Sequence, residues 1–317
     1  MPILAPLKPL FEAIAAAQPS IGEGDPARAR ANTHAMMEAN VLGFYAPRAP
    51  TATEADHVVP VAGGRITVRV YDPSRVSDRP LPCHVYFHGG SFWLGTLEHF
   101  DPVCRGLVED VGCVVVSVAY RLAPEHRFPT APEDCFAALG WVAEHAAELG
   151  VDPGRISVGG ASAGGNLAAV AALMARDRGG PTLVLQVLEV PIIDLTSLKP
   201  LNLPAEGVTL PSGKEVILHY YLSAPSDATN PYASPLCASD LRALPPALVM
   251  CAEYDPLAAE GAAYVRRLEA ADVPVEYRCW SGQFHGSQPM AALIPKEAAE
   301  YQAQVVRALR RAYGADA

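Results

Sequence analysis

The pattern of apolar positions predicts a helical N-terminal part, followed by a region in which strands and helices alternate. One helix face is predicted by apolar residues at helical spacing: Leu4, Leu7, Leu10, Phe11 and Ile14. A second helix is expected around 33–40. After a Pro-containing break at 46–50 the pattern changes, and 58–61 and 66–71 are expected to form two strands joined by a Gly-rich turn.

From residue 80 onward, short apolar runs alternate with helical segments. The expected strands are 83–87, 113–119, 156–159, 183–190, 247–251 and 275–280. The expected helices are 132–149, 165–176, 257–271 and 294–313. Repeated strand-then-helix order predicts an α/β protein with a mostly parallel central sheet, helices on both faces and an antiparallel edge formed by the first hairpin.

Residues 196–226 interrupt this rhythm with a Pro- and Leu-rich stretch that ends in aromatic residues. A long excursion inside a regular α/β pattern is typical of an insertion over an active site. We therefore expect 1–50 and 196–226 to form a helical cap, and 51–195 and 227–317 to form the two parts of the α/β core.

Composition narrows the classes of protein and partner. The formal net charge of −10 argues against nucleic acid as a partner. Seven cysteines without a C-x-x-C pair indicate free thiols in a reducing, cytoplasmic compartment. We find no signal peptide pattern and no apolar run of the ~18 residues that a membrane span requires, so stable membrane insertion is not expected. Neither a metal-ligand pattern nor a dinucleotide fingerprint is present, so no cofactor is implied.

The strongest chemical signal is the G-x-S-x-G motif at 160–164, between an expected strand and an expected helix. In that context the serine, Ser162, lies on a strained turn, and the following helix brings positive dipole to the site. The structural alternative is a Gly-rich turn without catalytic meaning. Strand–turn–helix context favours a nucleophile.

A nucleophilic serine needs a base and an acid that orients the base, and in this fold class they follow the serine in the order acid, then histidine. Only His219 and His285 lie beyond Ser162, and Asp255 follows an expected strand. Asp255 and His285 fit that order, although Asp255 also fits a helix N-cap and Glu253 is a neighbouring alternative acid.

A second motif, His88-Gly89-Gly90-Ser91-Phe92, follows the strand 83–87. Tetrahedral intermediates of acyl transfer need backbone N–H donors near the new oxyanion, and small residues let the backbone approach. Candidate donors are the amides of this loop and that of Ala163. His88 precedes the serine and is interpreted as a structural residue that holds the loop.

Together with the segment 120–129 and Asp255-Pro256-Leu257, these motifs resemble the hormone-sensitive-lipase-like branch of the α/β-hydrolase family, most of whose members are carboxylesterases. The resemblance runs from about residue 58 to the C-terminus. It implies Ser162 as nucleophile, His285 as general base and acid, Asp255 as its orienting acid, and an oxyanion hole from Gly89 or Gly90, Ser91 and Ala163. It also implies cis bonds at Ala123-Pro124 and Phe128-Pro129, and makes a homodimer through 275–280 and 294–313 a candidate assembly.

Three positions depart from the family pattern. Ser91 stands where a third glycine is usual, Ala161 where Asp or Thr is usual, and Ser287 where an aromatic residue is expected. None of them removes a catalytic group, but together they make substrate preference harder to predict.

The sequence therefore predicts a serine carboxylesterase that hydrolyses small to medium esters through an acyl-enzyme. A lactone, carbamate or amide substrate fits the same triad. A lipase with an apolar outer face on 4–14, or a non-catalytic ligand receptor, is a weaker alternative. A candidate substrate pocket, with core packing as the equal alternative, comprises Phe92, Trp93, Tyr220 and Tyr221, and favours short acyl chains.

Overall fold

A computed structural model describes residues 2–16, 25–51, 53–73, 80–203, 208–210 and 214–315 of the chain. Its centre is an eight-stranded sheet in the order β1-β2-β4-β3-β5-β6-β9-β10. The strands are β1 (Thr53–Val61), β2 (Gly64–Asp72), β3 (Leu81–Phe87), β4 (Val114–Ala119), β5 (Val151–Ala161), β6 (Leu183–Glu189), β9 (Ala247–Tyr254) and β10 (Val275–Phe284). All neighbours from β4 to β10 are parallel, whereas β1 pairs with β2 and β2 with β4 in antiparallel fashion. The predicted fold class and antiparallel edge are confirmed.

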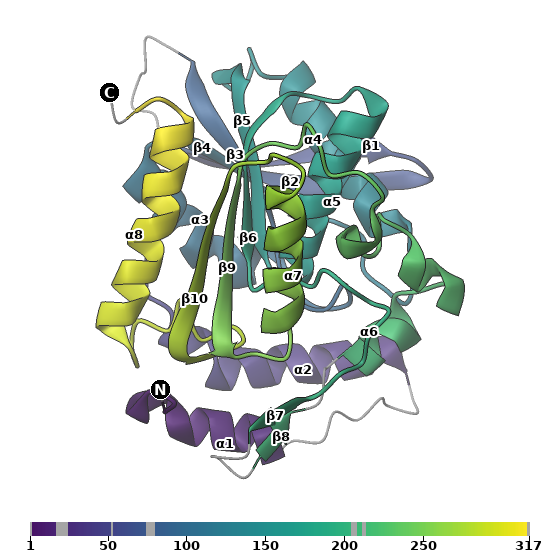
Figure 1. The fold of residues 1–317 in the computed structure, drawn as a ribbon. Coiled ribbons are helices and arrows are strands. Elements are labelled where there is room, and N and C mark those ends of the chain that lie inside the picture. Colours follow the sequence, from purple (N-terminus) through teal and green to yellow (C-terminus); the bar gives the residue numbers. More distant parts are fainter. Residues whose placement is uncertain are drawn as a thin grey trace.

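Helices cover both faces of the sheet (Figure 1). They are α3 (Leu97–Val111) and α8 (Pro295–Ala312) on one face, and α4 (Thr130–Glu144), α5 (Ala163–Arg178) and α7 (Ala258–Glu269) on the other. Alternation along β4 shows the two faces directly: Val114 and Val116 pack in the cluster with α4 and α5, and Val115 in the cluster with α3 and α8. Because both faces are covered, the central strands are mostly apolar, although a few polar side chains, such as those of His84, Ser117 and Gln186, are buried among them.

Several expected elements have other bounds in the structure, and one helix is not expected at all. The sequence pattern predicts no helix between 87 and 113, but α3 occupies most of that interval and includes Pro102. The helix expected over 132–149 ends at Glu144, and residues 145–150 form turns. The strand expected over 275–280 continues to Phe284, with a register shift after Trp280 that keeps it paired with β9. Long-range strand pairing decides this last boundary.

The N-terminal helices and the insertion lie together at one end of the sheet (Figure 1). This group comprises η1 (Ala5–Leu7), α1 (Lys8–Ala16), α2 (Pro26–Asn40), η2 (Leu42–Phe44), β7 (Leu201–Leu203), β8 (Val208–Leu210) and α6 (Lys214–Tyr220). Between α6 and β9 are η3 (Pro225–Thr229) and η4 (Pro235–Cys237). The arrangement is compatible with the expected cap, and the domain boundaries remain predictions.

The apolar face of the first helix is buried against the body of the protein. Leu7 and Phe11 are almost fully buried, and the Phe11 ring packs against those of Tyr254 and Phe284, with centroids 6.0 and 5.8 Å away. Tyr254 and Phe284 end β9 and β10, so this helix covers the carboxyl ends of these strands. The burial removes most of the apolar outer face that the lipase alternative requires.

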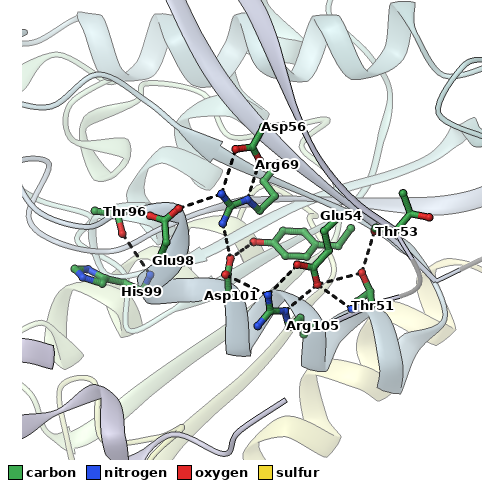
Figure 2. A network of polar contacts seen from close by, with 11 residues as sticks. Thr51, Thr53, Glu54, Asp56, Arg69, Thr96, Glu98, His99, Asp101 and Arg105 are labelled. Atoms are coloured by element: carbon green, nitrogen blue, oxygen red, sulfur yellow. Dashed lines mark hydrogen bonds and ion pairs between the residues drawn. The ribbon is translucent and has the colours of Figure 1, made fainter. Parts of the chain in front are cut away.

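Figure 2 shows a polar network that joins the β1–β2 hairpin to α3. Arg69 contacts Asp56 at 2.7 Å, Glu98 at 3.0 Å and Asp101 at 3.1 Å. Asp101 also accepts a hydrogen bond from the Tyr71 hydroxyl, and Arg105 bridges Asp101 and Glu54. The network fixes the amino-terminal half of α3, which follows directly on the loop after β3.

Candidate active site

Ser162 lies on the sharp turn between β5 and α5. Its backbone has φ +58° and ψ −115°, in a region that L residues rarely adopt. Glycines on either side make the turn compatible with close packing: a Cβ at Gly160 would lie 2.1 Å from the Phe87 carbonyl oxygen, and one at Gly164 only 1.9 Å from it. The motif therefore needs both glycines for steric reasons, and it presents the Ser162 side chain at the carboxyl edge of the sheet.

His285 and Asp255 lie beside this serine. The His285 Nε2 is 2.9 Å from the Ser162 Oγ, and its Nδ1 is 2.7 Å from the Asp255 Oδ2. Asp255 follows β9 and His285 follows β10, so two neighbouring parallel strands bring acid and base to the same edge. A continuous Ser–His–Asp hydrogen-bond chain results.

Asp255 has two structural contacts at once. Its Oδ1 accepts the N–H of Leu257 at 2.9 Å, in the turn that leads into α7, while its Oδ2 faces His285. Asp255 therefore supports the turn before α7, whose N-cap residue is Leu257, and faces His285 at the same time. The alternative acid, Glu253, accepts instead from the backbone N–H of Gly282.

Electrostatics at His285 favour its charged form. Burial alone lowers its pKa, but the Asp255 charge and hydrogen bond, with a further contribution from Glu260, raise the pKa above the ordinary 6.5. Glu260 is itself buried in an ion pair with Lys214 of α6. Because Asp255 bonds to Nδ1, the neutral imidazole presents an unprotonated Nε2 to the Ser162 hydroxyl.

The oxyanion loop, residues 88–95, has an unusual backbone. Gly90, Ser91 and Phe92 have φ values of +121°, +52° and +64° in succession. The departure at Ser91 thus keeps a left-handed conformation that would suit glycine better. Such strain persists only where surrounding contacts hold the chain.

Hydrogen bonds orient two peptide groups of this loop. The His88 Nδ1 donates to the Gly89 carbonyl oxygen at 2.8 Å, and the Gly90 carbonyl accepts from the N–H groups of Trp93 and Leu94 at 3.1 and 2.8 Å. In a trans peptide the C=O and the next N–H point in opposite directions. Holding these two carbonyls therefore aims the N–H groups of Gly90 and Ser91 to the other side of the loop.

His88 is locked by packing. Its ring stacks on Tyr120 with centroids 4.2 Å apart and lies 5.7 Å from that of Phe100. Burial lowers the pKa of His88 to about 4, so the ring is neutral at physiological pH. The contacts of this buried, neutral ring with Tyr120, Phe100 and the Gly89 carbonyl support its structural interpretation.

Two of the sequence departures have specific contacts in the structure. Ala161 pairs in register with Glu189 of β6, a buried carboxyl that accepts a hydrogen bond from the Tyr301 hydroxyl of α8. Ser287, also buried, accepts the Phe284 N–H at 3.1 Å and donates to the Phe284 carbonyl at 2.8 Å. The Ser287 hydroxyl therefore closes the turn that carries His285.

The four aromatic residues of the candidate pocket stack in pairs. Phe92 and Tyr221 lie parallel with ring centroids 3.9 Å apart, and Trp93 packs on Tyr220 at 5.1 Å. All four are more than nine-tenths buried. These pairs join the oxyanion loop to α6 and the residue after it, and a role in binding substrate remains a prediction.

Several residues of the site were not singled out from the sequence. Glu189 and Lys214 are buried ionisable groups: the Glu189 carbonyl accepts the Ser162 N–H, and Lys214 pairs with Glu260, whose charge acts on His285. An acidic residue that ends the apolar run of β6 was a visible signal for Glu189. Nothing local marks the contacts of Lys214, which joins α6 to α7. Both implied cis bonds, Ala123-Pro124 and Phe128-Pro129, are present.

Comparison with known proteins places this geometry in a family. Residues 84–288, more than half of the chain, match the family model of the alpha/beta hydrolase fold. The chain therefore belongs to the α/β-hydrolase family, and the resemblance to its hormone-sensitive-lipase-like branch is confirmed.

Individual relatives and structures agree with that assignment. The chain is 44% identical over 256 residues to carboxylesterase NlhH of Mycobacterium tuberculosis, covering 78% of each chain. It is 41% identical over 240 residues to an arylesterase of Saccharolobus solfataricus, covering 74% of this chain and 76% of the relative. The structure of a hyperthermophilic esterase from the archaeon Pyrobaculum calidifontis superposes with a TM-score of 0.86 at 40% identity, covering 98% of this chain and 99% of that one.

Proposed function

We propose that this protein is a serine carboxylesterase in which Ser162, His285 and Asp255 form the catalytic triad. It is an ester hydrolase, as are the relatives named above. The observation that carries the residue assignment is the chain of hydrogen bonds from Ser162 through His285 to Asp255, at 2.9 and 2.7 Å. Its geometry supports nucleophilic catalysis on an acyl group.

In the proposed mechanism His285 takes the proton of the Ser162 hydroxyl through Nε2 while the oxygen attacks the ester carbonyl. The carbonyl oxygen becomes an oxyanion, which accepts hydrogen bonds from the amides of Gly90 or Gly89, Ser91 and Ala163. The C–O bond to the alcohol then breaks, and His285 returns the proton to the departing alcohol oxygen. Asp255 stabilises the protonated imidazole throughout.

Water completes the cycle. His285, now neutral, removes a proton from water while the water oxygen attacks the acyl carbon. The bond between the acyl carbon and the Ser162 oxygen then breaks, and Ser162 takes the proton back from His285. The products are a carboxylic acid and an alcohol. A lactone, carbamate or amide would react through the same steps, since the triad does not contact the leaving group specifically.

We propose short to medium acyl chains as substrates, on the argument that the stacked pairs Phe92–Tyr221 and Trp93–Tyr220 close the space beside the oxyanion loop. A series of p-nitrophenyl esters from acetate to laurate, with wild type and Ser162→Ala side by side, tests both parts. Serine-dependent hydrolysis that peaks at short chains is expected. A peak at long chains would favour the lipase alternative, and no serine-dependent hydrolysis would contradict the ester assignment.

A matched control separates loss of the nucleophile from a general effect of substitution. Ser239→Ala removes a hydroxyl from an exposed position between η4 and β9 and should leave every rate unchanged. Ser162→Ala should lower kcat by about 10⁴-fold or more, because triad members act as a unit. Residual activity near the wild-type level would contradict Ser162 as the nucleophile.

A reducing, cytoplasmic location and a homodimer are further proposals. All seven cysteines are unpaired and five of them are buried, which supports a reducing compartment. Among the described helices, none has the length together with the apolar character needed to cross a bilayer. Size-exclusion chromatography with light scattering would test the dimer.

A further inference from the structure

Helix α2 presents three polar residues on one face, and two of them contact the oxyanion loop. Arg30, His34 and Glu38 are spaced four residues apart, so their side chains project in one row. Arg30 and His34 reach the oxyanion loop itself, and Glu38 reaches His99 in the first turn of α3 at 3.1 Å. We call Arg30, His34 and Glu38 the α2 row.

Arg30 joins two segments that meet at the loop. Its Nε donates to the Trp93 carbonyl at 2.7 Å, and one terminal nitrogen donates to the Ala123 carbonyl at 2.6 Å. The guanidinium also forms a two-pronged ion pair with Glu125, at 3.0 and 2.6 Å. Ala123 in turn donates its N–H to the Phe92 carbonyl at 2.9 Å. A planar guanidinium satisfies this fixed set of acceptors, which a lysine ammonium cannot match.

His34 contacts the far end of the same loop. Its Nε2 accepts the backbone N–H of Gly95 at 3.1 Å, which requires that nitrogen to be unprotonated. Burial lowers the pKa of His34, and the nearby His99 and Arg30 lower it further against the opposing charge of Glu38. His88, a further histidine close to His34, is itself neutral. His34 is therefore an acceptor at neutral pH.

Gly95 connects the contact made by His34 to the peptide groups of the oxyanion loop. Its φ is +98°, and a Cβ there would lie 2.4 Å from the His88 Nδ1 and 2.7 Å from the Gly89 carbonyl oxygen. Gly95 is thus packed on the very hydrogen bond that fixes the Gly89–Gly90 peptide. A continuous set of contacts runs from His34 through Gly95 and His88 to the N–H of Gly90.

We propose that Arg30 and His34 are positioning residues for the oxyanion hole, holding residues 88–95 in the strained conformation that aims the N–H groups of Gly90 and Ser91 at the developing oxyanion. This inference rests on the proposed function. Three consecutive positive φ values are not stable on their own account, and contacts from outside the loop must maintain them. Arg30 and His34 contact the loop at residues 93 and 95, immediately after that strained stretch.

The role predicts a defect in the transition state rather than in binding. Losing one oxyanion donor lowers kcat by about 10²–10³-fold, and displacing a donor costs part of that factor. We therefore expect Arg30→Lys and His34→Leu to lower kcat by about 10- to 100-fold with KM changed less than about 3-fold. His34→Gln, whose amide oxygen can accept from Gly95, should retain most of the wild-type kcat.

The experiment measures kcat and KM with p-nitrophenyl butyrate, and the inhibition constant of an alkyl trifluoromethyl ketone. This ketone forms a tetrahedral adduct with a serine hydroxyl, so its affinity reports on the oxyanion donors. Arg28→Lys is the matched control, because Arg28 lies on the same helix and is exposed. Circular dichroism and thermal unfolding verify that each variant folds. If His34→Leu does not fold, Arg30→Lys with its control Arg28→Lys still decides the question.

The proposal predicts that ketone affinity weakens in parallel with kcat in Arg30→Lys and His34→Leu. It is overturned if both variants keep the kcat of Arg28→Lys, if KM rises while kcat stays constant, or if kcat falls with unchanged ketone affinity.

Ser162→Ala in the same assay tests the function separately. If it retains activity, the proposed function fails; if it is inactive while Arg30 and His34 variants are normal, only the positioning role fails.

Discussion

The backbone N–H of Ser162 donates to the carbonyl oxygen of Glu189 at 2.8 Å, so the turn between β5 and α5 is held to the end of β6. The side chain of Glu189 contacts α8, where the Tyr301 hydroxyl donates to it. The residue whose backbone holds Ser162 therefore also carries a buried carboxyl. Its protonation should affect the stability of the whole site.

Glu189→Gln should remove a pH dependence from the free energy of unfolding. Burial raises the pKa of Glu189 above its ordinary 4.5, although the Tyr301 hydrogen bond opposes this. The folded state therefore keeps a proton that the unfolded state loses, and stability falls as pH rises from about 4.5 to the folded pKa, by about 1.4 kcal/mol per pH unit. Glutamine, which is neutral, should abolish that slope.

Urea unfolding between pH 4.5 and pH 8 measures this effect. Glu269→Gln, at an exposed position at the end of α7, is the matched control and should keep the wild-type slope. If Glu189→Gln shows the same slope as wild type, the carboxyl is not the source of the pH dependence.

Activity should rise with pH as His285 loses its proton. The neighbouring Asp255 raises the pKa of His285 despite burial, so the midpoint of log(kcat/KM) against pH should lie above 6.5. Asp255→Asn removes the charge, so the midpoint should move to lower pH and kcat should fall by about 10⁴-fold. Asn retains a side-chain oxygen that can accept the Leu257 N–H, which limits the structural effect.

The measurement is a pH–rate profile from pH 5 to pH 9 with the preferred ester. The exposed Asp240 offers a control substitution, Asp240→Asn, that should leave the profile unchanged. A flat profile from acid to neutral pH would contradict a histidine base, and a fully active Asp255→Asn would direct attention to Glu253.

Arg69→Met should destabilise the fold by about 1–3 kcal/mol at pH 7, because three carboxylates would be left together without their shared cation. Arg69 lowers the pKa of Asp56 through its hydrogen bond. The contribution of the Arg69–Asp56 pair to the free energy of unfolding is therefore present above the ordinary pKa of an aspartate. It is lost as the pH falls through the lowered pKa of Asp56. Salt should weaken it as well.

Chemical unfolding at pH 7 and pH 3, at low and high salt, checks the effect. Arg65→Met on the same strand removes an exposed arginine and should change stability by less than about 0.5 kcal/mol. Equal destabilisation of the two variants would show that the network in Figure 2 contributes little.

Tyr221→Phe should keep or raise stability, whereas Tyr221→Leu should lower it. The Tyr221 hydroxyl is buried and has no hydrogen-bond partner among the described residues, so removing it relieves an unfavourable burial of about 1 kcal/mol. The ring stacks on Phe92, and phenylalanine preserves that contact. Leucine loses it, at a cost of about 1–3 kcal/mol.

Thermal unfolding and the ester chain-length profile should be measured together on these two variants. If the stacked pair limits the space for the acyl chain, Tyr221→Leu should shift the preference toward longer esters and Tyr221→Phe should not. A destabilised Tyr221→Phe would mean that the hydroxyl has a stabilising partner.

Nearby residues in the sequence are enough to predict the fold class and most of the helices and strands. The alternation of apolar strands with helices depends on side-chain periods of two and about 3.6 residues, so it predicted the parallel sheet, its antiparallel edge and most elements. The motif at 160–164 and the chain order of Ser162, Asp255 and His285 indicated the triad, because turn chemistry and strand ends follow from nearby residues. Local sequence does not fix where a helix or strand ends: the helix predicted over 132–149 ends at Glu144.

Tertiary structure decided which distant groups meet. Arg30 and Trp93 are 63 residues apart, and Tyr301 and Glu189 are 112 apart, yet each pair forms a hydrogen bond. No local period encodes such contacts, because they depend on how α2 and α8 pack on the sheet. The same packing stacks Phe92 on Tyr221 and extends β10 to Phe284. It also brings Ser162, His285 and Asp255 into one chain of hydrogen bonds.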